Sequence, residues 1–172
     1  TSGTEYFMIG ISSKESTSST KELGKNSCDY AYRGDNGKIR NDNAETSFGN
    51  TYGVGNIIGV AVDYDNGALY LSKDGVWQNS GNPESGASKT GAVSITTPPI
   101  GDDGDGIYYP AWGFFDGTQK GTVQANFGDG YFGTTAVSSA QNPDDGIGIF
   151  EYDVPAGYRA LCTTSLNAQE YS

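Results

Sequence analysis

Short runs of alternating apolar and polar residues follow one another along this chain, and turn-forming residues interrupt them every few positions. Apolar positions at helical spacing are almost absent. This pattern predicts an all-β fold, because short strands separated by Gly, Asn, Asp and Ser are typical of sandwiches and barrels. The expected strands are 6–11, 29–33, 38–41, 57–64, 68–72, 76–78, 92–95, 109–115, 122–127 and 158–162.

The clearest of these runs is 57–72, where Asn66 and Gly67 separate two strands. Asn-Gly is the strongest short-range signal for a two-residue hairpin turn of type I′. The pairs that this turn predicts are Tyr64 with Leu69, Val62 with Leu71, and Asp63 with Tyr70. Apolar residues then lie opposite apolar residues, so the turn and the alternation agree. A second turn at 73–75 leads into 76–78 and predicts a three-stranded meander.

The composition excludes several classes of function. The 172 residues include no histidine, which removes Ser-His-Asp triads, histidine bases and histidine metal ligands. Two cysteines are too few for a four-cysteine zinc site. The net charge of −11, from 10 basic and 21 acidic residues, argues against nucleic acid and against an anionic membrane surface.

The length fits one domain, and 12 Tyr, 7 Phe and 2 Trp can supply its core. We expect a single sandwich over 1–172, with a core at 6–128 and a C-terminal extension at 129–172. Cys28 and Cys162 could form a disulfide or remain thiols. Free thiols are favoured, because an aromatic-rich domain of this size forms a core without a covalent cross-link.

Several motifs occur in a fixed order along the chain. They are Tyr30-Ala31-Tyr32-Arg33-Gly34, the run from Tyr52 to Asp63, Asn66-Gly67 with Leu69, Lys73-Asp74-Gly75, Tyr109-Pro110-Ala111-Trp112-Gly113, and the run from Val123 to Gly128. Their order and spacing resemble the SPRY domain, a concanavalin-like β-sandwich. The resemblance covers 6–128 and implies a two-sheet antiparallel jelly roll that binds partners through loops at one end. The regions that match those loops are 30–35 and 74–78.

The C-terminal segment carries a second resemblance. Gly146-Ile147-Gly148-Ile149-Phe150, followed by the run from Val154 to Thr163, is similar to the end of SPRY-containing bacteriophage structural and tail-fibre proteins. This resemblance implies a virion or extracellular location, with other copies of the chain, neighbouring virion proteins, or a host-surface glycan or protein as partners. SPRY domains usually begin with an additional strand before the one at 6–11. We therefore expect a piece of a longer chain, or a neighbouring subunit that covers the open sheet edge.

Residues near the expected strand ends are candidate partner contacts. They are Tyr32, Arg33, Tyr52, Asp74, Trp77 and Tyr108. Aromatic faces stack on sugar rings and anchor protein partners. Core packing is the alternative, and it is favoured for Trp112, whereas both roles stay open for Tyr32, Arg33 and Trp77. The best-known partner-binding residues of the SPRY family do not form a recognisable set here, so the resemblance implies no specific ligand.

Acidic residues are the remaining candidates for chemistry. The loops 101–106 and 142–146 offer carboxylates for calcium, but EF-hand spacing is absent and Asp and Gly also favour turns, which is the preferred interpretation. A glycosidase needs two carboxylates roughly 5 to 9.5 Å apart. The strand carboxylates Asp29, Asp63 and Glu151 form no obvious pair. We expect no catalytic residues, no metal and no cofactor.

Three functions remain open. The favoured hypothesis is a non-enzymatic virion module, in a tail fibre, a tail or a capsid surface, that assembles symmetrically or attaches to a host. The alternatives are a SPRY-type adaptor that recognises a peptide, with its pocket at the end of Tyr32 and Trp77, and a carbohydrate-binding module. None of the three involves nucleic acid or membrane insertion.

Overall fold

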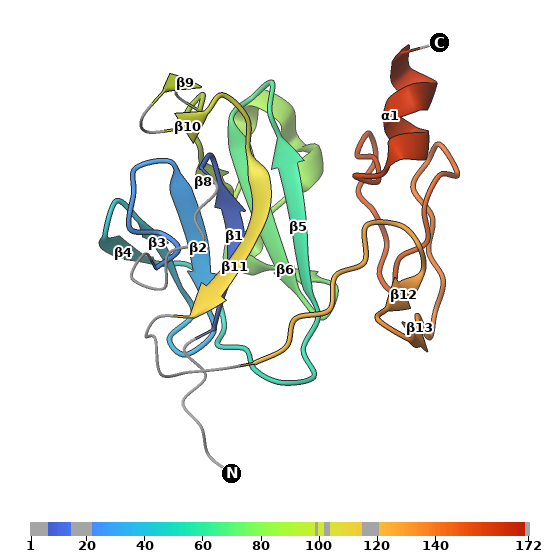
Figure 1. Cartoon of the computed structure of the whole chain (residues 1–172), viewed down its shortest axis with the longest axis horizontal. Helices are drawn as coiled ribbons and strands as arrows, with labels where there is room; N and C mark the ends of the chain where they lie inside the picture. Colours follow the sequence, from blue (N-terminus) through green and yellow to red (C-terminus); the bar gives the residue numbers. More distant parts are fainter. Residues whose placement is uncertain (1–6, 15–21, 99, 102–103, 115–120, 171–172) are drawn as a thin grey trace. The chain divides into compact units, whose positions relative to one another are not determined.

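Two antiparallel β-sheets enclose a shared core in the first part of the chain (Figure 1). The structure is a computed structural model that describes residues 7–14, 22–98, 100–101, 104–114 and 121–170. The chain divides into two compact units, Thr1–Gly121 and Thr122–Ser172. Both large sheets belong to the first unit, and the predicted all-β sandwich is confirmed. Among the described residues, no helix is long and apolar enough to cross a membrane.

The first sheet has the strand order β11-β1-β2-β3-β4. Its strands are β1 (Phe7–Ser12), β2 (Asp29–Arg33), β3 (Lys38–Asn41), β4 (Ala44–Ser47) and β11 (Tyr109–Phe114). Side chains alternate along the central strands, so Ile11 and Tyr32 join the core between the sheets. Met8 and Ala31 lie on the opposite face, where Leu23 packs against them. Both faces of this sheet are therefore covered at its centre.

The second sheet consists of β5, β6 and β7, and β8 also pairs with β6. Its strands are β5 (Ile58–Asp63), β6 (Ala68–Lys73), β7 (Val76–Trp77) and β8 (Val93–Ser94). Leu69 and Leu71 of β6 face the core. The neighbouring Tyr70 is buried, and its hydroxyl lies 3.1 Å from the Ser85 hydroxyl in η2 (Pro83–Ser88), which follows η1 (Gln78–Ser80). A short pair, β9 (Ile100–Gly101) and β10 (Gly104–Asp105), completes the unit.

The hairpin between β5 and β6 differs from the prediction in its turn. The turn has four residues, Tyr64 to Gly67, and the Asp63 carboxylate accepts hydrogen bonds from the main-chain and side-chain nitrogens of Asn66, at 3.0 and 2.8 Å. The observed pairs are Asp63 with Ala68, Val62 with Leu69, Ala61 with Tyr70 and Val60 with Leu71. The predicted two-residue turn is wrong because Asp63 closes a wider one. The register shift is two residues, so each side chain keeps its predicted face.

Two expected strands are absent from the described residues, and β4, β9, β10 and the two-residue strands at 131–132 and 135–136 were not predicted. The expected strands at 122–127 and 158–162 do not form, since neither segment has strand pairing in the structure. The unpredicted strand β4 pairs with β3 through a turn at Asp42 and Asn43. Both of these residues have positive φ, 49° and 60°, as a type I′ turn requires.

The second unit is built mainly from turns. It contains β12 (Tyr131–Phe132), β13 (Thr135–Ala136) and α1 (Thr163–Glu170). Asn126 organises its beginning: the side-chain amide donates to the Ile149 carbonyl at 2.9 Å and accepts from the Gly128 main chain at 2.7 Å. The unit boundary before Thr122 falls inside the 6–128 core that the resemblance implied.

Candidate functional site

The turn after β6 is held by Asp74, one of the predicted contact residues. Its carboxylate accepts hydrogen bonds from the Asn56 side chain at 2.7 Å and from the Ile57 main chain at 2.9 Å. The main-chain nitrogen of Asp74 in turn donates to the Ile57 carbonyl at 2.8 Å. These three bonds join the loop before β5 to the turn between β6 and β7. We call the loop before β5 and the turn between β6 and β7, together with the residues packed beneath them, the Asp74 end.

Tyr32 and Tyr52 lie buried beneath the same end. The Tyr52 hydroxyl donates to the Tyr32 carbonyl at 2.6 Å, and the Tyr32 hydroxyl donates to the Asn50 carbonyl. The Gln78 side-chain oxygen accepts a hydrogen bond from the Asn50 main-chain nitrogen at 2.8 Å, and this bond holds the loop between β4 and β5. Burial raises the pKa of Tyr32 to about 12 and also raises the pKa of Tyr52, because it disfavours the charged phenolate.

Arg33 is buried and paired with two carboxylates. Its guanidinium donates two hydrogen bonds to Asp35, at 2.9 and 2.6 Å, and one to Glu45. Burial alone would lower the pKa of Arg33, but the hydrogen bonds and charges of Asp35 and Glu45 outweigh it and raise that pKa. Arg33 thereby connects the end of β2 to Asp35 in the following turn and to Glu45 on β4.

Two apolar residues, one in the loop before β5 and one in β7, add exposed surface to the Asp74 end. Val54 is 92% exposed and Val76 is 65% exposed; along the chain, Val54 precedes Asn56 and Val76 follows Asp74. Trp77 is half-buried beside them in β7. Val76 lies in 74–78, one of the two regions that the resemblance predicted, whereas Val54 lies in the 52–63 motif and was not predicted as a contact, because an exposed valine in a loop is indistinguishable from an ordinary surface residue.

Five of the six predicted contacts therefore lie around one end of the unit: Tyr32, Arg33, Tyr52, Asp74 and Trp77. Tyr32, Arg33 and Tyr52 are buried and support the loops above them. Their direct contact with a partner stays a prediction. Trp112, for which core packing was favoured, is 56% exposed on β11, so that expectation is wrong. Strand β11 lies at the edge of its sheet and pairs only with β1 among the described strands, which leaves its inner face partly uncovered.

The sixth predicted contact, Tyr108, lies at a different place. Its hydroxyl donates to the Thr96 carbonyl at 2.7 Å, and its ring meets the rings of Tyr30 and Tyr64 edge to face. Burial raises the pKa of Tyr108. These contacts place Tyr108 behind a pocket that the prediction did not include.

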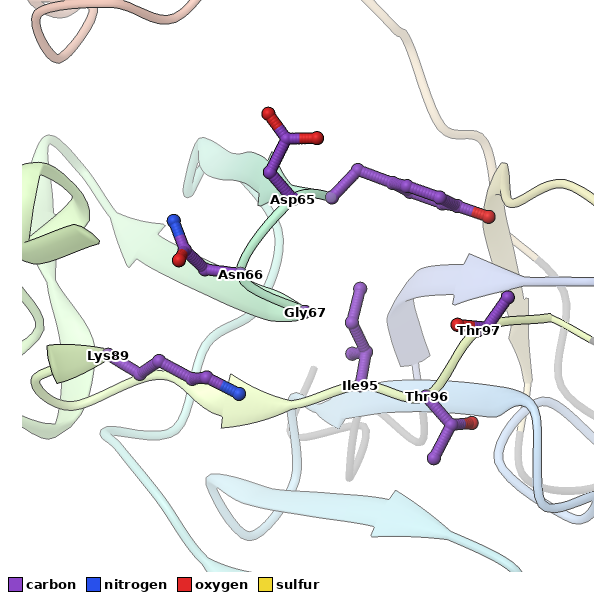
Figure 2. Close-up of a pocket in the computed structure, with 8 residues that line it drawn as sticks. Asp65, Asn66, Gly67, Lys89, Ile95, Thr96 and Thr97 are labelled. Atoms are coloured by element: carbon purple, nitrogen blue, oxygen red, sulfur yellow. The ribbon is translucent and has the colours of Figure 1, made fainter. Parts of the chain in front are cut away.

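That pocket, which we call the Tyr64 pocket, has a volume of about 230 Å³ (Figure 2). The residues that line it are 64–67, Lys89 and 95–97. In Figure 2 the side chain of Lys89, the residue that follows η2, extends toward Gly67 and Ile95. Three segments far apart in the sequence form this pocket, which is why no local motif indicated it.

The acidic loops show turn contacts where the structure describes them. In the second loop, Asp145 accepts from the Ile147 main chain at 2.9 Å and Asp144 from the Gly157 main chain at 3.3 Å. Asp102 and Asp103, in the first loop, lie outside the described residues. Among the residues that are described, no three acidic or cysteine side chains are grouped to hold a metal ion.

The strand carboxylates are bonded within their own surroundings. Asp29 accepts from the Ser12 hydroxyl at 2.6 Å and from the Asn26 side chain at 3.0 Å. Asp63 closes the hairpin turn already described. Cys28 and Cys162 are free thiols, as expected.

Comparison with known proteins identifies the sandwich region. A family model described as SPRY domain matches residues 1–95, which is more than half of the 172-residue chain. The matched range contains the motifs from Tyr30 to Gly75 and ends before those that begin at Tyr109. A search of the curated proteins finds no match.

Proposed function

The chain belongs to the SPRY domain family, and we propose that it is a non-catalytic interaction module that binds a protein partner at the Asp74 end. The observation that carries this proposal is a pair of exposed valines next to tightly bonded main chain, Val54 in a loop and Val76 in β7. Along the chain, Val54 precedes Asn56 and Val76 follows Asp74, and Asp74 makes three hydrogen bonds with Asn56 and Ile57.

Pre-organisation is the physical reason to favour this surface. A partner that binds to loops already held in place loses less conformational entropy than one that must order them. Beneath these loops, Tyr52 bonds to Tyr32, and Gln78 bonds to Asn50. Exposed valines on a rigid support add apolar contact area, and the neighbouring Trp77 is the residue type that most often anchors a protein interface.

The absence of catalysis is part of the same proposal. General acid–base chemistry requires a titratable group positioned against a substrate. Asp29 and Asp63, the two sandwich-strand carboxylates considered for catalysis, instead accept hydrogen bonds from Ser12 and Asn66. Their oxygens stabilise a strand end and a turn.

We further propose that the module works in a virus particle, as a structural or adhesion component. The support is the similarity of 146–150 and 154–163 to the ends of bacteriophage structural proteins, together with the net charge of −11. A strongly acidic surface keeps exposed subunits soluble, because like charges repel non-specific contacts. Partners would then be neighbouring virion proteins, further copies of the chain or a host-surface protein.

A peptide display library selected on the full chain tests the binding surface. Selected peptides should lose binding to the double variant Val54→Glu and Val76→Glu, because buried carboxylates without partners are costly at an interface. Ile100→Glu is the matched control, since Ile100 is an exposed apolar residue on β9, outside the Asp74 end. Peptides that bind the double variant as tightly as the control would overturn the proposed surface.

The particle context has its own test. Antibodies against the chain should label purified virus particles in electron micrographs of the source culture. Labelling confined to host-cell material, with none on particles, would favour the adaptor hypothesis instead.

A further inference from the structure

We propose that the Tyr64 pocket binds one pyranose ring of a saccharide. The pocket involves none of the residues of the Asp74 end, so this inference stands independently of the proposed protein partner. Its volume of about 230 Å³ lies below the roughly 300–1,000 Å³ of pockets for drug-sized ligands, which suits a ligand of one small ring.

The segment 95–97, which lines one side of the pocket, is held in place by hydrogen bonds within the chain. Thr96 donates its main-chain hydrogen bond to the Tyr30 hydroxyl at 3.2 Å, and its carbonyl accepts from Tyr108 at 2.7 Å. The main-chain nitrogen of the preceding residue, Ile95, donates a hydrogen bond to the Gly67 carbonyl at 3.0 Å. The segment 95–97 is therefore fixed against both the hairpin turn and the two tyrosines.

Polar groups with unused bonding capacity line the space. Among the described residues, the Lys89 ammonium and the Asp65 carboxylate make no side-chain hydrogen bond or ion pair. Lys89 offers three donors, Asp65 offers only acceptors, and the Thr97 hydroxyl offers both. A ligand that carries several hydroxyl groups on one ring can satisfy donors and acceptors of this kind together.

An aromatic residue also lines the pocket. The Tyr64 side chain is 51% exposed, and its ring is held edge to face against Tyr108, with centroids 6.3 Å apart. Exposed aromatic rings present an apolar body with a polar tip, which suits the alternating C–H and O–H surface of a sugar. Ile95 is the only aliphatic lining residue with a long side chain, so an apolar peptide side chain would be poorly matched.

The charge of the chain bears on the kind of saccharide. At −11 overall, the protein repels polyanionic ligands at long range. A neutral hexose, or a uronic acid with one carboxylate facing Lys89, is compatible with that field. Both share the hydroxyl-bearing pyranose ring that the pocket is proposed to recognise.

Titration of the isotope-labelled full chain by NMR tests the proposal. The probes are galactose, glucose, N-acetylglucosamine and glucuronic acid, each added separately. At least one probe should shift the amide signals of 64–67, Lys89 and 95–97, and a response to glucuronic acid alone would identify the carboxylate as a required group. Absence of shifts in these residues with all four probes would overturn the proposal.

Variants then separate specific binding from general effects. For the probe that binds, Tyr64→Ala and Lys89→Met should each weaken affinity at least about tenfold, or 1.4 kcal/mol. Tyr131→Ala and Lys25→Met are the controls, because Tyr131 is 48% exposed and Lys25 is also exposed, both outside the pocket. Equal affinity of Lys89→Met and Lys25→Met would contradict the assignment even if Tyr64→Ala fails to fold.

Discussion

The hydroxyl of Tyr52 donates a hydrogen bond to the main-chain carbonyl of Tyr32, 2.6 Å away, and both residues are buried. This contact ties the loop before β5 to the centre of the first sheet. Removal of the hydroxyl in Tyr52→Phe should lower the free energy of unfolding by about 1 kcal/mol, the usual net value of such a bond. Urea denaturation followed by tryptophan fluorescence measures it, since both tryptophans, Trp77 and Trp112, belong to the first unit. Tyr131→Phe, at an exposed site, should change nothing.

Alkaline pH should destabilise the sandwich through the same two phenols. Burial raises the pKa of Tyr32 from 10.0 to about 12 and raises that of Tyr52 as well. Above pH 10 the unfolded chain therefore binds fewer protons than the folded one, and stability falls with rising pH. The expected slope is about 1.4 kcal/mol per pH unit for each affected tyrosine, and smaller in Tyr52→Phe. Denaturation midpoints that stay constant from pH 9 to 12 would contradict this prediction.

Arg33 and Lys38 share the carboxylate of Glu45 but should contribute very differently to stability. Arg33 is buried, so Arg33→Met leaves Asp35 and Glu45 without their main partner and should cost about 3–5 kcal/mol. Lys38 is exposed and lies 3.4 Å from Glu45, so Lys38→Met should cost at most about 1 kcal/mol. Equal losses in the two variants, measured by urea denaturation, would show that the buried pair has no special role.

Gly10 lies in β1, in register with Ala31 of β2. A Cβ atom at this position would be 1.8 Å from the Tyr30 carbonyl oxygen, and a main-chain atom in a sheet cannot move aside cheaply. Gly10→Ala should therefore cost at least about 3 kcal/mol, at the upper end of overpacking penalties. Gly113→Ala, on the adjacent β11, meets its nearest atom at 3.7 Å and should stay within about 0.5 kcal/mol of the parent. Thermal unfolding of the two variants makes the comparison.

Glu151 in the second unit should titrate below its usual range. The Ser138 hydroxyl and main-chain nitrogen both donate to its carboxylate, and these bonds lower the pKa of Glu151. Their stabilising effect is present above the ordinary pKa of Glu and is lost as the pH falls through the lowered value. Ser138→Ala should raise the pKa of Glu151, which carboxyl NMR titration measures. An unchanged midpoint would show that the Ser138 hydroxyl does not act on it.

Strands of the core were predictable because alternation and burial coincide there. The bounds of β2 and β3 match the prediction, and in both strands the core-facing positions hold Tyr or Ile. Strand β4 was not predictable in the same way: its four residues are exposed, and only the turn at Asp42 and Asn43 positions it.

The expected strand at 122–127 is absent for a local reason. The alternation at 122–127 predicts a strand, but the Asn126 side chain bonds to main-chain groups of Gly128 and Ile149, and such bonds compete with strand pairing. Tyr32 and Arg33 are buried in β2, and the sequence leaves both roles open for them because aromatic and arginine side chains suit a core with paired carboxylates as well as an interface. The Tyr64 pocket depends on Lys89 and 95–97 meeting the hairpin, which no single stretch of sequence encodes.

The four-residue turn between β5 and β6 has a consequence for the evolution of this surface. Val62 and Val60 keep their faces although the pairing differs by two residues from the tighter hairpin. Insertions or deletions of two residues at 64–67 would thus reshape the Tyr64 pocket while the interior stays the same. Such a change would alter the proposed saccharide site while the strand pairing that holds the sandwich core is kept.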